Sequence, residues 1–336
     1  MDFDLSAEQR DLAAAAADFF SSSASPARSR AMLDDRTLAP EPGHAALAGS
    51  GFAAITVPES AGGGGGSVLD LAVVAEQAGR VLAGPSLVTA ARVAVLLAGD
   101  DAGLAELASG ERRFAVVDDG AATLDAVGAD TFLALAGDRL VRAEGVVTPG
   151  DPIDATRGLG MVALGEQRVI AEDVALRWRH AERVARVVLA AEDLGTAGRA
   201  VEIGVAYAQQ RHAFGRAIGS YQAVKHALVD AYVEVEQLRS LVWWAAWAAD
   251  EAPEELPLAS AAAKAQAATA LERAAETLIQ VHGGIGFTWE HDAHLYWRRA
   301  KVDRFLLGDD VAAYDEVARL ALDAASAPAR EAVPQG

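Results

Sequence analysis

The chain has 336 residues and no cysteine, its formal net charge at pH 7 is −19, and 52% of its residues are hydrophobic. The lack of cysteine excludes disulfides, thiolate metal ligands and a cysteine nucleophile. The acidic balance disfavours binding to nucleic acids and anionic membranes, which need a basic surface. An anionic ligand would have to be met by a local basic patch.

The sequence gives no sign of insertion into a membrane or of export. No apolar run reaches the ~18 uninterrupted residues of a membrane helix. Asp2 and Asp4 stand where a secretory signal would carry basic residues. We therefore expect no membrane span and a cytoplasmic protein.

Roughly the first hundred residues favour helices. Leu5, Leu12 and Phe19 recur on one helical face among many alanines. Five consecutive glycines at 62–66 predict a loop. Helices are predicted at 5–24, 29–35, 43–50 and 69–82, with a further helix after Gly84 and Pro85 that runs to Leu97.

The middle of the chain favours strands. Short apolar runs alternate with Asp, Gly and Arg, a pattern typical of small strands. The predicted strands lie at 114–117, 132–135, 140–141, 161–164 and 174–176, with Phe114 and Phe132 as core residues of their strands. We expect a reduced β-rich middle domain at 111–178, between a helical N-terminal domain at 1–110 and a helical domain at 179–336.

The part of the chain from about residue 183 to the end is predicted to form a helical bundle. Its connections are short, as in antiparallel bundles. Trp243, Trp244 and Trp247 have helical spacing and indicate a bundle core or a subunit interface. The predicted helices lie at 183–210, 220–250, 257–281, 291–304 and 309–325. The expected fold class is therefore α+β and mainly α.

Two stretches of the bundle carry residue types that suit a nucleotide. Gly283, Gly284 and Gly286 follow a long alanine-rich helix, where bare backbone amides can approach a phosphate closely. Arg211 and Phe214 lie between two helices, ahead of Gln222. A guanidinium suits pyrophosphate, an aromatic ring can stack on a base, and a carboxamide can donate and accept hydrogen bonds.

These stretches resemble the C-terminal signature of the acyl-CoA dehydrogenase family. The resemblance rests on Arg211-His212-Ala213-Phe214-Gly215, on Tyr221-Gln222, and on the segment from Gln280 to Phe287. Val57-Pro58-Glu59 and the helix carrying Glu76 and Gly79 are similar to the family's N-terminal domain. The resemblance implies a helical N-terminal domain, a middle β-domain and a C-terminal four-helix bundle.

The resemblance also implies a cofactor and partners. In that family FAD crosses a subunit interface, with its flavin in one middle domain and its adenosine and pyrophosphate on the neighbouring bundle. The positions that match the family's adenosine and pyrophosphate contacts are Arg211, Phe214, Gln222, Gln280, Gly283 and Gly284. The substrate would be an acyl-CoA, and the family's usual electron acceptor is an electron-transfer flavoprotein.

Two departures from the family pattern affect the catalytic half of the site. The Thr-Glu-Pro-Gly and Trp-Ile-Thr-Asn-Gly types of flavin-binding strand are missing between residues 100 and 180. The family's general base is a glutamate, but Leu307 stands at its usual position and Ala185 at its alternative position, just before Arg186. Neither side chain can accept a proton.

Other polar residues have structural as well as functional interpretations. Asp309, Glu192 and Glu290 could be displaced bases. Asp309 is more simply a first-turn acid of a helix, Glu290 and Asp292 are helix-capping acids, and Glu192 is a packed carboxylate. We interpret His282, His291 and His294 as polar or interface residues rather than metal ligands. The basic run Arg298, Arg299, Lys301 and Arg304 is either a solvated face or a local positive patch.

The sequence favours a subunit of a heteromeric, α2β2-type acyl-CoA dehydrogenase. This chain would anchor the adenosine half of FAD, while a homologous partner subunit would supply the base. A bulky acyl group is the expected substrate. The alternatives are a self-sufficient flavoenzyme with a displaced base, such as Asp309 or Glu192, and a non-catalytic assembly protein.

Overall fold

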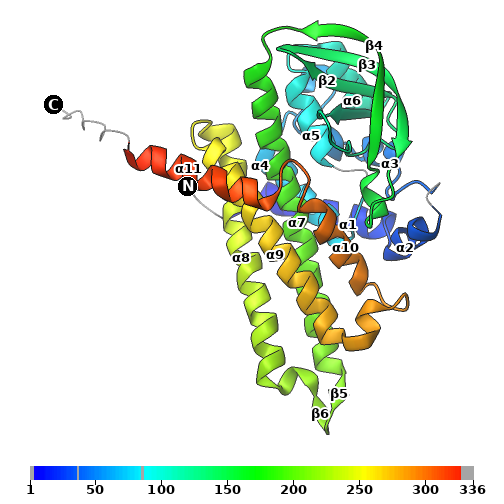
Figure 1. Cartoon of the computed structure of the whole chain (residues 1–336), viewed down its shortest axis with the longest axis vertical. Helices are drawn as coiled ribbons and strands as arrows, with labels where there is room; N and C mark the ends of the chain where they lie inside the picture. Colours follow the sequence, from blue (N-terminus) through cyan, green and yellow to red (C-terminus); the bar gives the residue numbers. More distant parts are fainter. Residues whose placement is uncertain (1–3, 36–37, 85–86, 327–336) are drawn as a thin grey trace, which may run out of the picture.

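A computed structural model describes residues 4–35, 38–84 and 87–326 of the chain. Asp2 and Pro85, which entered the sequence predictions, lie outside the described residues. A long helical bundle extends from one end of the molecule, and a small sheet with shorter helices forms the other end (Figure 1). This arrangement confirms the predicted fold class, α+β and mainly α.

Six helices build the first hundred residues. Ser6 and Ser67 start two of them with capping boxes. In each, the serine hydroxyl accepts the backbone N–H of the third helical residue, and the side chain of that residue accepts the backbone N–H of the serine. Short 3-10 turns at Phe52–Ala54 and Glu59–Ala61 flank the loop before the glycine run. The helices are α1 (Ala7–Ser23), α2 (Pro26–Asp34), α3 (His44–Ser50), α4 (Val68–Arg80), α5 (Leu87–Leu96) and α6 (Asp101–Ser109).

One four-stranded sheet forms the middle part, in the order β1-β2-β3-β4. The first pair is parallel and the other two are antiparallel. Phe114 and Phe132 are buried in it, as predicted. The strands are β1 (Phe114–Val117), β2 (Thr131–Ala136), β3 (Arg139–Pro149) and β4 (Gly160–Ala171).

The strand predicted at 174–176 is wrong. Residues Ala175 and Leu176 form the first turn of a helix, and the N–H of Trp178 donates to the carbonyl of Val174 at 2.7 Å. A run of three apolar residues fits a strand or a helix equally well, and only the longer helical pattern after it decides. The expected domain boundary at 178 falls inside this helix, so the division into three domains stays a prediction.

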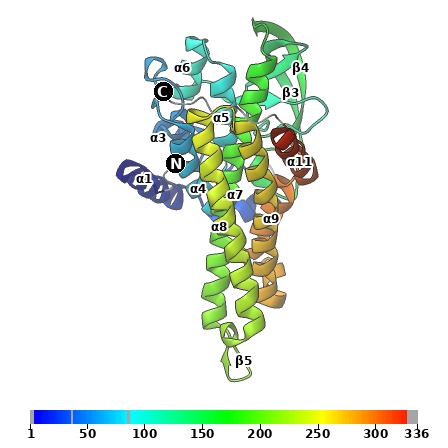
Figure 2. The ribbon, with the colours of Figure 1, turned by 90° about the vertical axis from the view of Figure 1, so that its left-hand side faces the viewer.

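The three longest helices of the bundle are α7 (Ala175–Gln210), α8 (Gln222–Glu251) and α9 (Leu256–His282). A small hairpin of β5 (His212–Ala213) and β6 (Arg216–Ala217) connects α7 to α8 (Figure 2). Two shorter helices follow, α10 (Ala293–Asp303) and α11 (Asp310–Ser326). Trp243 is buried in the bundle, and the indole N–H of Trp244 donates to Glu255 at 2.7 Å. None of the helices in the described part of the chain is long and apolar enough to cross a membrane.

Two glycines let α4 and α7 cross at backbone contact. A Cβ on Gly79 would lie 1.8 Å from the carbonyl oxygen of Glu192, and a Cβ on Gly195 would lie 1.8 Å from that of Glu76. Any side chain at either position would force the helices apart, because interiors are close-packed. This crossing fixes the N-terminal helices on the bundle.

Candidate functional site at the end of the bundle

The six residues predicted to contact the cofactor are all exposed, and they come from one end of the bundle. Arg211 and Phe214 follow the end of α7, Gln222 begins α8, and Gln280 precedes the end of α9 at Gly283 and Gly284. The ends of α7 and α9 and the start of α8 lie together, far from the sheet (Figure 1). Long antiparallel helices thus bring the two predicted stretches to one place.

A stacking contact joins the two stretches directly. The ring of Tyr207, one turn before Arg211, stacks on the ring of His282, which precedes Gly283, with 4.0 Å between the ring centroids. The N–H of Arg211 donates to the carbonyl of Tyr207 at 2.8 Å. The end of α7 and the glycine segment therefore form one surface.

The hairpin tip holds an aromatic ring in solvent. Phe214 is 97% exposed, and its φ of 50° lies in the left-handed region that side chains rarely adopt. The hairpin is nevertheless fixed, because the hydroxyl of Tyr221 donates to the carbonyl of Ala213 at 3.1 Å. The guanidinium of Arg216 also lies 3.9 Å from the centroid of the Tyr221 ring. A rigid hairpin that presents a bare phenylalanine is a contact surface for another molecule.

The glycine segment leaves open backbone at the end of α9. Gly283 has a φ of 63°, and no atom lies within 4 Å of where a Cβ would stand on it or on Gly284. Gly286 packs inward, because a Cβ on it would lie 2.8 Å from the Cβ of His282. In the part of the chain that the structure describes, no ion pair engages the guanidinium of Arg211. A guanidinium without an ion-pair partner among the described residues, at the same end of the bundle as open glycine backbone (Figure 1), suits an anionic ligand such as a pyrophosphate.

The three histidines near the glycine segment have structural partners. His282 donates from Nδ1 to the carbonyl of Leu278 at 2.8 Å, and burial lowers its pKa. Nδ1 of His291 accepts the N–H of Ala293 at 3.0 Å, and Nδ1 of His294 accepts the Nε–H of Arg298 at 3.2 Å. Among residues 4–35, 38–84 and 87–326, no group of three His, Cys, Asp or Glu residues could hold a metal ion.

Leu307 lines a cavity of about 300 Å³ that also includes Val88, Leu124 and Gly308. The carbonyl of Leu307 accepts the Nε–H of Arg186 at 3.0 Å. Two carboxylates border the cavity, and each is paired with an arginine: Asp118 with Arg92 at 2.6 Å and Glu182 with Arg186 at 2.8 Å. Ala185 is fully buried.

The acids named as possible displaced bases are engaged elsewhere or stand in solvent. The carboxylate of Asp309 accepts the N–H of Ala312 at 2.8 Å, which confirms its place at a helix start. Glu192 is packed, as predicted, and forms an ion pair with Arg157 at 2.5 Å. Glu290 is exposed. The capping role expected for Asp292 is wrong, since its side chain makes no cap and instead lies 3.3 Å from Arg30.

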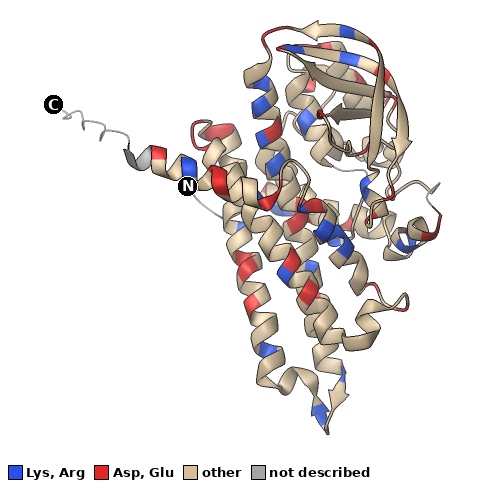
Figure 3. Ribbon diagram, in the orientation of Figure 1, with Lys and Arg blue, Asp and Glu red and all other residues tan. Residues whose placement is uncertain are grey.

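The interpretation of the basic run as a solvated face is wrong for most of its members. Arg299 is 1% exposed and donates from Nε to Asp154 at 2.5 Å. Lys301 and Arg304 are both paired with Glu272, and Arg304 also donates to Asp310 at 2.8 Å. Figure 3 shows these blue segments next to red ones on neighbouring helices. The basic run therefore ties α10 to its surroundings and supplies no separate positive patch.

A buried ionic cluster beneath the sheet was missed by sequence reasoning. Asp154 and Arg157 come from the connection before β4: Asp154 pairs with Arg299 of α10, and Arg157 pairs with Glu192 of α7 and Asp303 of α10. Lys264 of α9 joins the cluster by donating to the backbone carbonyl of Asp303 at 2.9 Å. Burial, together with the nearby carboxylate of Asp303, raises the pKa of Asp193 well above its usual range. Burial lowers the pKa of Lys264. The one available signal was the presence of charged residues inside alanine-rich helices.

Comparison with known families decides what this fold is. The acyl-CoA dehydrogenase N-terminal domain matches residues 6–107, and the acyl-CoA dehydrogenase C-terminal domain matches residues 167–322. The chain belongs to the acyl-CoA dehydrogenase family. The resemblance inferred from sequence is thereby confirmed, together with the oxidoreductase class acting on acyl-CoA and with FAD, the cofactor expected for a member of the family.

Relatives and solved structures agree with this assignment. Acyl-CoA dehydrogenase IpdE2 of Mycolicibacterium smegmatis is 36% identical over 261 residues, which cover 77% of this chain and 80% of that protein. A variant of the Tcur3481–Tcur3483 steroid ACAD has a TM-score of 0.85 at 26% identity and covers 95% of this chain and 99% of its own. The ChsE4–ChsE5 complex from Mycobacterium tuberculosis has a TM-score of 0.80 at 26% identity and covers 98% of this chain and 100% of its own.

Proposed function

We propose that this acyl-CoA dehydrogenase family member works as one subunit of a heteromeric enzyme, arranged as α2β2 with a homologous subunit. Its role is to hold the adenosine and pyrophosphate half of an FAD whose flavin lies in the partner. Arg211 would contact the pyrophosphate, and Gln280, Gly283 and Gly284 would line the adenosine side. Phe214 and Gln222 would complete the contact from the hairpin and from the start of α8.

The exposed ring of Phe214 is the main observation in support of this proposal. Leaving a phenylalanine side chain in water rather than burying it costs about 1.5–3 kcal/mol. Its left-handed backbone adds strain that a glycine or asparagine would avoid. Tyr221 and Arg216 hold the hairpin in this shape, so the ring is kept ready for a surface outside the chain. Arg211, whose guanidinium forms no ion pair with any described residue, precedes Phe214 by three positions.

The cavity around Leu307 supports the division of labour between two subunits. Leu307 and Ala185 occupy the two positions where the family carries its base. The carboxylates that border the cavity, Asp118 and Glu182, are each held by an arginine. A self-sufficient enzyme using Asp309 or Glu192 is less well supported, because one carboxylate caps a helix and the other is enclosed with Arg157.

In the assembled enzyme, FAD supplies the hydride acceptor for oxidation of an acyl-CoA across its Cα–Cβ bond. This chain's residues would bind and orient the dinucleotide rather than move a proton. Solved relatives described as a steroid ACAD and as a two-protein complex favour a bulky acyl group and a homologous partner subunit. The assembly-only alternative gives no reason for Arg211, Phe214 and the glycines to lie together.

The test is FAD retention by the complex purified with its partner subunit. Arg211→Ala and Phe214→Ser should each lower the FAD retained after dialysis without changing the molar mass of the complex. Arg319→Ala, an exposed arginine on α11, is the matched control and should retain FAD like the wild type. Unchanged retention in both site variants would refute the assignment of these residues.

A further inference from the structure

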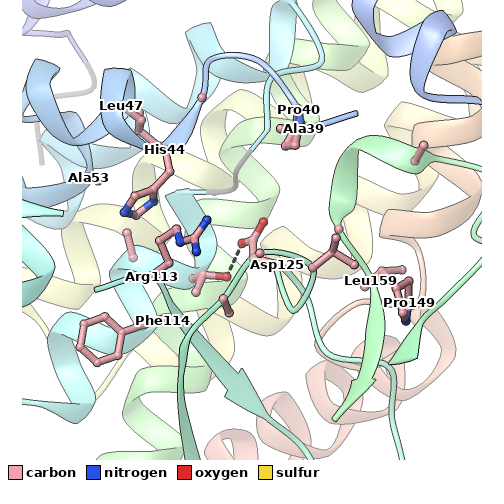
Figure 4. Close-up of a pocket in the computed structure, with 18 of the residues that line it drawn as sticks. Ala39, Pro40, His44, Leu47, Ala53, Arg113, Phe114, Asp125, Pro149 and Leu159 are labelled. Carbon is pink, nitrogen blue, oxygen red and sulfur yellow. Dashed lines mark hydrogen bonds between the residues drawn. The ribbon is translucent and has the colours of Figure 1, made fainter. Parts of the chain in front are cut away.

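A second cavity lies at the junction of the N-terminal helices and the sheet. It has a volume of about 340 Å³, within the ~300–1,000 Å³ typical of small-molecule pockets. Its walls are mainly apolar and come from the segment 38–48, from α5 and α6, and from the loops around the sheet (Figure 4). The apolar wall residues central to the argument are Met32, Pro40, Leu47, Leu107, Phe114 and Leu159.

A small set of polar side chains faces this cavity. The hydroxyl of Thr89 donates to the carboxylate of Asp125 at 2.5 Å, and Arg113 and His44 lie nearby (Figure 4). Arg113 reaches a carboxylate only at 3.5 Å, from its Nε to Asp130. Burial lowers the pKa of His44, whose Nε2 lies 3.3 Å from the carbonyl of Gly110. Among the described lining residues, Arg113 is the one basic side chain with a fixed charge and Asp125 is the one acid.

The cavity is separate from the one around Leu307, although the two share a wall. Thr89 lines both cavities, while Leu124 faces the Leu307 cavity and its neighbour Asp125 faces the second cavity. The first turn of α5 and the segment 124–125 thus form the partition. A ligand in the second cavity would not occupy the position where the family carries its base.

We propose that the second cavity binds a neutral, mostly apolar small molecule with a hydroxyl or carbonyl group. The apolar walls would take the body of the ligand, since burying apolar surface is the main source of affinity in such sites. A carbonyl would accept from Arg113, and a hydroxyl would donate to Asp125, whose carboxylate has several acceptor positions. Because an arginine and an aspartate both line the cavity, a ligand with net charge would meet a like charge as well as an opposite one. This site is independent of the proposed FAD role.

A neutral, environment-sensitive naphthalene ketone, 6-propionyl-2-dimethylaminonaphthalene, is the probe for the full-length chain. We expect saturable binding at one probe per chain, with emission shifted to the blue. Ala129→Trp and Ala39→Trp add bulk to the cavity wall and should each weaken binding at least about tenfold, or ~1.4 kcal/mol. Ala46→Trp adds the same side chain at an exposed position of α3 outside the cavity and should bind like the wild type.

The preference for a neutral ligand is tested with an anionic probe, 1-anilinonaphthalene-8-sulfonate. Asp125 has a φ of 56°, which asparagine tolerates well, and Asp125→Asn removes the charge while keeping a side-chain oxygen that can accept from Thr89. This change should strengthen sulfonate binding relative to the neutral ketone by about tenfold. Either of two results would overturn the proposal: no saturable ketone binding by the wild type, or ketone binding by both cavity-wall variants equal to that of Ala46→Trp. An unchanged preference in Asp125→Asn would overturn the charge argument.

Discussion

Arg157 and Glu192 form an ion pair of 2.5 Å in which the two side chains are only 1% and 3% exposed. Arg157 belongs to the connection before β4, and Glu192 lies in the middle of α7. The other carboxylate oxygen of Glu192 accepts the N–H of Leu87, the first residue of α5, at 3.1 Å. One carboxylate thus joins the sheet connection, the N-terminal helices and the bundle.

Breaking this pair should be costly. Glu192→Gln removes one of the two carboxylates that pair with the buried Arg157 guanidinium, the other being Asp303, and breaking a buried ion pair typically costs about 3–5 kcal/mol. We expect the free energy of unfolding in urea to fall by about 3 kcal/mol. Asp323→Asn on α11 removes an exposed partner of Arg319 and is the control, expected to change stability by less than about 0.5 kcal/mol. Equal stability of the two variants would contradict the structural role of Glu192.

The helix crossing at Gly195 makes a second stability prediction. Gly195→Ala would place a methyl group against the carbonyl of Glu76 and should destabilise the protein by about 1–3 kcal/mol or more. Gly49→Ala on α3 meets no atom within 4 Å and should be neutral or stabilising by up to about 1 kcal/mol. Thermal unfolding of both variants checks the pair. Helix propensity alone would stabilise both variants alike, so an equal change in the two would contradict the close contact at the crossing.

The raised pKa of the Asp193 carboxyl implies that the stability of the protein depends on pH. Burial and the neighbouring Asp303 raise its pKa in the folded protein above the usual value of 3.8, so the folded state holds a proton that the unfolded state releases. This group's contribution to stability is therefore greatest below about pH 4 and declines as the pH rises towards the folded pKa. Asp193→Asn mimics the protonated form and should remove that decline. Unfolding in urea at several pH values tests this, and parallel curves for wild type and variant would contradict it.

Most of the helices could be predicted from sequence because their apolar spacing and end signals are local. The bundle helices were expected within two residues of their observed bounds, except that α7 begins at Ala175 and not at the predicted residue 183. The short helix α6 was not singled out, although Asp100 caps its start and Gly110 ends it. The error at 174–176 arose because three apolar residues carry no period of their own.

The candidate site was predictable in composition but only partly in geometry. The stretches around Arg211 and Gly283 were identified by residue type, and the antiparallel bundle explains why they meet. The contact between Tyr207 and His282 could not be derived, since it depends on the register of α7 against α9. The buried ion pair of Arg157 and Asp303 could not be predicted either, since it also depends on how distant segments pack together. It joins residues 146 positions apart.

The most direct test of the split-site account is the flavin content and molar mass of the purified chain, alone and co-expressed with a homologous partner subunit. The account predicts a colourless chain when it is alone. The complex should be yellow, with one FAD per heterodimer and the molar mass of an α2β2 assembly. A yellow homo-oligomer with one FAD per chain would contradict it and return attention to a carboxylate base within this chain.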